Sequence, residues 1–182
     1  MKLILKKYMM PIILSIITIV LLTLLRLIKQ TSFSINELSL WGIIIANTLV
    51  IRTIDDLFDY QDDLKNNKKV IPLKIQCLLF VIFAITSVVL SVFISGLFGL
   101  IISIAYLLFI AISFRQLTSL KIFIYPFHLF LSFMMLLNIY QNTFNNIFSY
   151  IYIIVVVIIV LVTSMIYGVI KRGKKYETIH NN

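Results

Sequence analysis

The 182-residue sequence is poor in the residues on which soluble domains depend. Only 13% of its residues are charged, and it has seven acidic residues, one Cys, three Pro and five Gly. Soluble chains are about 25% charged, so a soluble domain is excluded. The single Cys excludes a disulfide scaffold. Apolar residues instead make up 61% of the chain, and the mean hydropathy is +1.06. This composition predicts an all-α, polytopic membrane protein with one transmembrane domain over residues 1–182.

Six apolar runs are long enough to cross a bilayer as helices, which takes about 20 residues each. We expect transmembrane helices over residues 8–28, 37–54, 75–95, 97–114, 120–139 and 147–170. The first run resembles a signal peptide, but its length and the lack of a small-x-small cleavage site predict an uncleaved span. Gly96 and Gly99 predict a tight hairpin, and Pro126 predicts a kink in the fifth run.

The distribution of basic residues predicts the topology. Lys and Arg gather at the N-terminus, around the second and fourth connections, and in the C-terminal tail. Of the sixteen Lys and Arg, only Arg26 and Lys29 lie on the other side. The positive-inside rule therefore predicts a multi-pass protein of a bacterial-type cell membrane, with both termini in the cytoplasm. Because topology accounts for the net charge of +9, we expect no nucleic-acid partner.

Acidic residues are concentrated directly after the second run. Five of the seven lie within nine positions: Asp55, Asp56, Asp59, Asp62 and Asp63. On a helix at about 100° per residue they share an arc of about 120°. Like charges on one helical face repel each other. Two interpretations stay open: a charged loop solvated at the cytoplasmic interface, or a site for Mg²⁺, which takes carboxylate oxygens together with substrate phosphates.

At these residues the sequence resembles the UbiA-type intramembrane prenyltransferases. The first motif of that family is Asn/Asp-x-x-x-Asp-x-x-x-Asp at the cytoplasmic end of the second span, and Asp55, Asp59 and Asp63 stand at its three positions. Arg52 precedes the motif, as an Arg often does in one subgroup. The resemblance rests mainly on this motif.

Two other parts of the family pattern are incomplete. Lys68, Lys69 and Pro72 resemble a degraded form of the family's basic Arg-Pro loop. The family has nine spans and a second Asp-rich motif, whereas this sequence has about six spans and no Asp after the first motif. Lys171 and Arg172 resemble a basic string that one subgroup carries near the second motif; a positive-inside stop signal is the alternative.

The resemblance implies a helical bundle similar to the first two-thirds of the UbiA fold, with a central cavity. Asp55, Asp59 and Asp63 would be the catalytic and magnesium-binding residues. The Mg²⁺ would hold the diphosphate of an isoprenyl donor, and the isoprenyl group would pass to a lipophilic acceptor. The implied substrate-binding residues are Arg52, Lys68, Lys69, Lys171 and Arg172.

Other functions stay open beside this one. The chain could be a truncated or non-catalytic relative, acting as a homo-oligomer or with a partner subunit that supplies the missing helices. It could also be an unrelated small membrane subunit or an immunity-type protein. Aromatic residues could stabilise an allylic cation, with ordinary packing as the alternative; these are Tyr60, Tyr106, Phe114, Tyr125 and Phe127.

Two polar residues inside the apolar runs are further candidates. His128 has no second ligand at metal spacing, so we expect a buried, hydrogen-bonded residue and not a metal ligand. Thr48 falls on the acidic arc and either lines the same cavity or hydrogen-bonds its own backbone.

Overall fold

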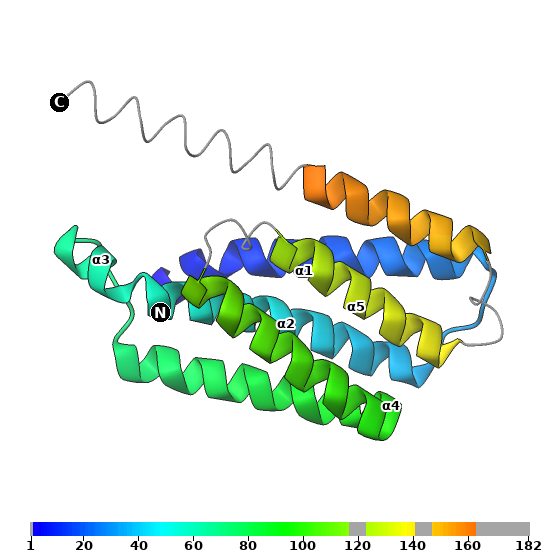
Figure 1. Ribbon diagram of the computed structural model, residues 1–182, viewed down its shortest axis with the longest axis horizontal. Coiled ribbons are helices and arrows are strands. Elements are labelled where there is room, and N and C mark those ends of the chain that lie inside the picture. Colours follow the sequence, from blue (N-terminus) through cyan, green and yellow to red (C-terminus); the bar gives the residue numbers. More distant parts are fainter. Residues whose placement is uncertain (1, 117–122, 141–146, 163–182) are drawn as a thin grey trace.

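The computed structural model describes residues 2–116, 123–140 and 147–162, and within these ranges the chain is helical except at short connections (Figure 1). The prediction of an all-α protein is therefore confirmed for the described residues, which contain no strand. Lys171 and Arg172 lie outside the described residues. The helices are α1 (Lys2–Ile28), α2 (Ile35–Phe58), α3 (Tyr60–Lys65), α4 (Leu73–Gln116), α5 (Ile124–Ile139) and the unlabelled Ile147–Val162.

Three of the described helices are long and apolar enough to cross a membrane: α1 over Lys7–Ile28, α2 over Ile35–Phe58 and α4 over Leu73–Phe114. α5 and Ile147–Val162 are apolar but shorter. Large apolar side chains are exposed on the outer faces of these helices. Such faces suit contact with lipid, where exposed apolar surface carries no penalty.

α4 is a hairpin of two helical arms, which is the reversal that the two glycines predict. Gly96 has φ 54° and ψ −131°, a left-handed conformation that breaks the helix. Three residues later, a Cβ on Gly99 would lie 1.9 Å from the carbonyl oxygen of Ser91 on the first arm. The two arms therefore run back along each other with backbone in close contact (Figure 1).

α2 occupies the middle of the bundle, packed against α1, α4 and α5 (Figure 1). Its N-terminal half joins an apolar cluster with α1, α5 and the Ile147–Val162 helix. Its C-terminal half joins a second cluster with α4 and α5, which includes Val50, Tyr106 and Ile124. This central position carries the acidic C-terminal end of α2 to one end of the bundle.

Polar side chains bridge the helices inside the bundle. Ser15 of α1 shares a hydrogen bond with Thr48 of α2, and Ser87 of α4 donates to Asn47 of α2 at 2.6 Å. Thr48 also donates to the backbone of its own helix, which agrees with the backbone alternative for this residue. Hydrogen bonds of this kind, together with close packing, hold helices together where lipid supplies no hydrophobic driving force.

Candidate functional site

A buried charged cluster lies at one end of the bundle, where α1 begins and α2 ends; we call this the charged end (left in Figure 1). Asp56 is its centre, with a side chain only 2% exposed. Its Oδ1 accepts from Lys7 Nζ at 3.2 Å and from Arg52 at 2.6 Å. Arg52 also donates to Asp55 at 2.9 Å. Arg52, which the resemblance implies as a substrate-binding residue, thus pairs with two carboxylates of its own helix.

Lys7 was not among the residues predicted for the site, and Asp56 was predicted only as a member of the acidic arc. The i,i+4 spacing of Arg52 and Asp56 was the available signal for their ion pair. Lys7 is 49 residues from Asp56 along the chain, and only the packing of α1 against α2 brings the two together. α1 begins at Lys2, ahead of the first apolar run, and this early start carries Lys7 to the level of Asp56.

The five acidic residues do not share one environment, because the helix bends among them. α2 ends at Phe58, Asp59 forms the bend, and α3 extends beyond the bundle (Figure 1). Backbone hydrogen bonds still link Asp59 to Asp55 and Asp63 to Asp59. Asp56 is buried, whereas Asp59 is exposed. The continuous anionic face expected from the sequence is therefore interrupted at Asp59.

The magnesium ion that the resemblance implies does not fit the carboxylates in this arrangement. In the part of the chain that the structure describes, no three His, Cys, Asp or Glu side chains lie together as metal ligands. Asp55 pairs with Arg52, and Asp63 pairs with Lys68. The cations of the protein thus already neutralise two of the three predicted ligands. Magnesium binding by Asp55, Asp59 and Asp63 stays a prediction.

Lys68 and Asp63 form a surface pair that should withstand wide changes of pH. Lys68 Nζ donates to Asp63 Oδ1 at 2.6 Å, which lowers the pKa of Asp63 below 3.8 and raises the pKa of Lys68 above 10.5. Because the pKa of Asp63 is lowered on folding, the pair stabilises the folded protein fully above pH 3.8. This stabilisation is lost as the pH falls through the pKa of Asp63 in the folded protein. Because the pKa of Lys68 is raised on folding, the same stabilisation is complete below pH 10.5. It is lost as the pH rises through the pKa of Lys68 in the folded protein.

In a carboxyl NMR titration we expect Asp63 to titrate below 3.8 and to return towards that value in Lys68→Ala. The matched variant Lys65→Ala removes a neighbouring cation that is not among the causes of the Asp63 shift, so it should leave the titration unchanged. An Asp63 titration that does not respond to Lys68→Ala would show that the pair does not form.

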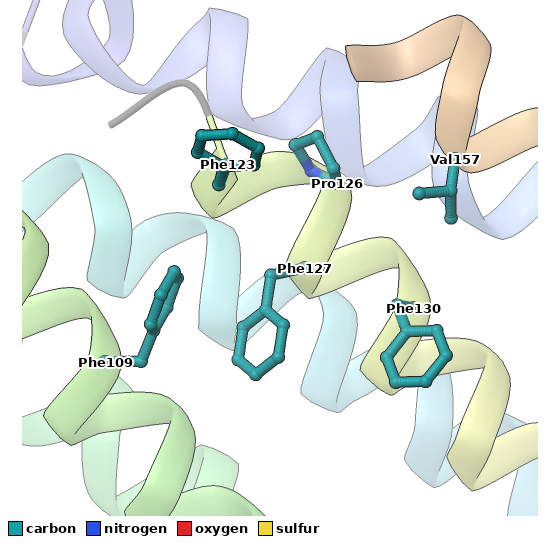
Figure 2. Close-up of a pocket in the computed structure, with 6 residues that line it drawn as sticks. All are labelled: Phe109, Phe123, Pro126, Phe127, Phe130 and Val157. Atoms are coloured by element: carbon teal, nitrogen blue, oxygen red, sulfur yellow. The ribbon is translucent and has the colours of Figure 1, made fainter. Parts of the chain in front are cut away.

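An apolar groove of about 480 Å³ opens between the second arm of α4, the first turns of α5 and the Ile147–Val162 helix (Figure 2). This volume falls within the range of about 300–1,000 Å³ that is usual for ligand pockets. Its lining consists of four phenylalanines with one Pro and one Val: Phe109, Phe123, Pro126, Phe127, Phe130 and Val157. With no polar side chain among the described residues of its wall, the groove suits a hydrocarbon chain.

The start of α5 packs against the C-terminal half of α2, where Ile124 joins an apolar cluster with Val50 and Ile54. Phe123 and Pro126 line the groove. Tyr125, between them in the sequence, is close enough to Asp55 and Arg52 to interact with both electrostatically. The groove and the charged end therefore lie near the same end of the bundle.

The opposite end of the bundle has a second buried ion pair. Arg26 Nε lies 3.2 Å from Glu37 Oε1, and Glu37 is 1% exposed. The Tyr140 hydroxyl donates to Glu37 at 3.1 Å and accepts from the Ser34 backbone N–H at 3.0 Å. These contacts tie α1, α2 and the end of α5 together, and they give an acidic partner to Arg26, which lies outside the basic clusters of the sequence.

The remaining candidates are placed as follows. Lys69 is exposed in the connection after α3. His128 is buried as expected, but neither ring nitrogen has a hydrogen-bond partner among the described residues, so the expected hydrogen bond is missing. Phe127 lines the groove, and Tyr106 packs in the cluster beside it. No family model matches the chain, and no significant similarity to a curated protein or a solved structure is found.

Proposed function

We propose that this chain is an integral membrane protein that binds an isoprenoid lipid diphosphate, the donor class implied by its resemblance to the UbiA-type prenyltransferases. We further propose that the charged end faces the cytoplasm, as the positive-inside rule predicts. The observation that supports the proposal is that a phenylalanine-lined groove opens near the end of the bundle that holds a cluster of Lys, Arg and Asp.

The groove would hold the isoprenyl chain. Phe123 and Phe130 are roughly half exposed on its rim, and the phenylalanine faces offer a dry apolar surface. Burial of apolar surface contributes about 25 cal/mol per Å², so a chain of several isoprene units would gain most of its affinity here. The open side of the groove would let the chain enter from the bilayer.

The basic residues near α3 would receive the diphosphate. Lys68 and Lys69 are both exposed after α3, where a phosphate at the membrane surface can reach them. Lys binds phosphate as a compact point charge, without the fixed bidentate geometry of Arg. Arg52 is partly exposed and would contribute from the end of α2, at the cost of sharing its pairs with Asp55 and Asp56.

Transfer of the isoprenyl group to a lipophilic acceptor belongs to the same proposal. In the family that the sequence resembles, Mg²⁺ held by this motif neutralises the leaving diphosphate. In the present arrangement Asp55, Asp59 and Asp63 do not fit the metal, because Asp55 pairs with Arg52 and Asp63 pairs with Lys68.

A second candidate function is binding without catalysis. The observation that favours it is the pairing of the carboxylates with cations of the protein, which leaves Asp55 and Asp63 neutralised without any metal. A non-catalytic relative of this kind would bind the same lipid, alone or beside a partner subunit, and would release no diphosphate.

The proposal is tested by the affinity of the protein in lipid nanodiscs for farnesyl diphosphate and for farnesol, its neutral counterpart. The double variant Lys68→Ala/Lys69→Ala should weaken diphosphate binding about tenfold, because charge-assisted hydrogen bonds contribute about 1.5–3 kcal/mol. Farnesol binding should not change. Lys29→Ala is the matched control, since Lys29 lies at the opposite end against Phe148.

An equal loss of diphosphate affinity in Lys29→Ala would point to a diffuse charge effect and would count against the site. Repeating the titration with Mg²⁺ and with EDTA separates the two candidate functions. Affinity that depends on Mg²⁺ and is lost in Asp59→Asn supports the metal-dependent transferase. Affinity that is indifferent to both changes supports binding alone.

A further inference from the structure

Two polar side chains meet deep inside the bundle without hydrogen-bond partners. Tyr106 of the second α4 arm and His128 of α5 are each 1% exposed, and their ring centroids are 5.7 Å apart. Neither the Tyr106 hydroxyl nor either nitrogen of His128 has a hydrogen-bond partner in the described part of the chain. We call these two residues the buried polar pair.

Burying two polar side chains without hydrogen bonds costs free energy, so their presence calls for an explanation. A polar group moved from water into an apolar environment without a compensating hydrogen bond is destabilising, and buried polar groups in proteins are nearly always paired. Packing alone would be served equally well by Phe at position 106 and by Leu at position 128. Polar groups retained inside a membrane bundle at this cost mark functional sites by default.

Phe127 connects the buried polar pair to the groove. Its ring lines the groove next to the ring of Phe109, with the two ring centroids 4.5 Å apart (Figure 2). It also stacks on the ring of Tyr106, with centroids 6.2 Å apart. Phe127 therefore touches the groove on one side and the polar pair on the other. A ligand in the groove would have to displace the Phe127 side chain to reach Tyr106.

We propose that the groove also takes a lipid-soluble alcohol or phenol, whose hydroxyl reaches past Phe127 to the buried polar pair. A hydroxyl both donates and accepts one hydrogen bond. A neutral imidazole offers one donor and one acceptor nitrogen, and the Tyr106 hydroxyl can take either role. One ligand hydroxyl can thus satisfy both residues, while the hydrocarbon part lies among the phenylalanines.

The same pair gives discrimination against plain hydrocarbons. A hydrocarbon in the groove would leave the polar pair unsatisfied, whereas an alcohol would repair it, and sites of this kind reject analogues that lack the polar group. The inference uses the groove of the proposed function but does not depend on diphosphate binding at the charged end, so either can fail alone.

The test uses ¹⁵N-histidine NMR of the full chain in nanodiscs, titrated with farnesol and with the C15 hydrocarbon farnesene. The sequence contains only two His, so His180→Gln assigns the His128 imidazole directly. We expect farnesol to shift a ring nitrogen of His128 and farnesene to leave it unmoved. An absent shift with farnesol, or the same shift with both compounds, overturns the proposal.

Tyr106→Phe provides the second test, because it removes the hydroxyl and keeps the ring. The affinity for farnesol should fall about tenfold. The affinity for farnesyl diphosphate, whose head group is proposed to bind at the charged end, should not change. Since the lost hydroxyl has no partner, the thermal midpoint should stay equal or rise.

Tyr140→Phe is the matched control. That hydroxyl bonds Glu37, Ser32 and Ser34 at the opposite end, so the midpoint should fall and farnesol affinity should hold. Unchanged farnesol affinity in Tyr106→Phe, or an equal loss in both variants, overturns the proposal.

Discussion

Gly99→Ala should destabilise the protein more than any other methyl-sized change in the described residues. The added Cβ would lie 1.9 Å from the Ser91 carbonyl oxygen and 2.5 Å from its carbonyl carbon, both backbone atoms that cannot rotate away. The two arms of α4 would have to move apart at this contact beside the turn. Overpacking in a close-packed interior costs about 1–3 kcal/mol, and a backbone contact this short places the loss at about 3 kcal/mol or above.

Gly96→Ala is the matched control in the same turn. Gly96 has φ 54°, so a side chain there is strained, but no atom lies within 4 Å of its Cβ position. Left-handed backbone costs an L-residue about 1–2 kcal/mol. The free energy of unfolding, measured reversibly in mixed micelles, should therefore be lower for Gly96→Ala than for wild type. It should be much lower again for Gly99→Ala. Equal losses in the two variants would mean that the arms of α4 do not approach as closely as the structure shows.

Asp56→Ala should give the second large loss, because it removes the centre of the charged cluster. Asp56 is 2% exposed and accepts from both Lys7 and Arg52. Loss of one partner of a buried ion pair costs about 3–5 kcal/mol, since the remaining charge is left in a low dielectric. The side chains of Lys7 and Arg52 are 16% and 28% exposed, so both can turn towards water. We therefore expect the free energy of unfolding to fall by about 3 kcal/mol, at the lower end of this range.

Asp55→Ala is the natural comparison, because it removes the neighbouring carboxylate of the same Arg. The Asp55 side chain is 32% exposed, and exposed pairs contribute about 0.2–1 kcal/mol. The two variants remove the same chemical group one residue apart, so their difference measures the burial of Asp56 together with its additional pair to Lys7. If Asp55→Ala costs as much as Asp56→Ala, the cluster is not centred on Asp56.

The sequence predicted the turn of α4 because that turn depends on local chemistry. A helix reversal with positive φ requires glycine, and a second glycine three residues on allows the backbone of the two arms to touch. Gly96 and Gly99 supply both conditions within one short segment. The all-helical character followed in the same way from apolar runs that are too long and too poor in charge for any soluble fold.

The five acidic residues from Asp55 to Asp63 show what the local sequence could not predict. A helical wheel places five Asp on one arc only if the helix is straight, but the axis bends at Asp59 and the burial of the carboxylates diverges. Whether Asp56 lies in lipid, in water or against a cation depends on where α1 packs. No pattern within α2 carries that information, and Lys7 was therefore missed.

The groove could not be predicted for a similar reason. Its wall combines Phe109, Phe127 and Val157 from three helices that are distant in sequence, and an apolar chain offers many equivalent phenylalanines. Phe127 was a candidate on aromatic chemistry alone. His128 was expected to be buried and hydrogen-bonded; burial followed from its apolar surroundings, whereas its missing partner depends on which residues face it across the bundle.

Photocrosslinking tests the binding of a lipid diphosphate most directly. A farnesyl diphosphate analogue with a diazirine in its isoprenyl chain would be irradiated with the protein in vesicles, and the labelled peptides would be mapped by mass spectrometry. We expect label on residues 123–130, displaced by unlabelled farnesyl diphosphate and reduced in Lys68→Ala/Lys69→Ala. Label spread evenly over outward apolar residues such as Ile16 and Val89, with no displacement by unlabelled ligand, would contradict the proposed site.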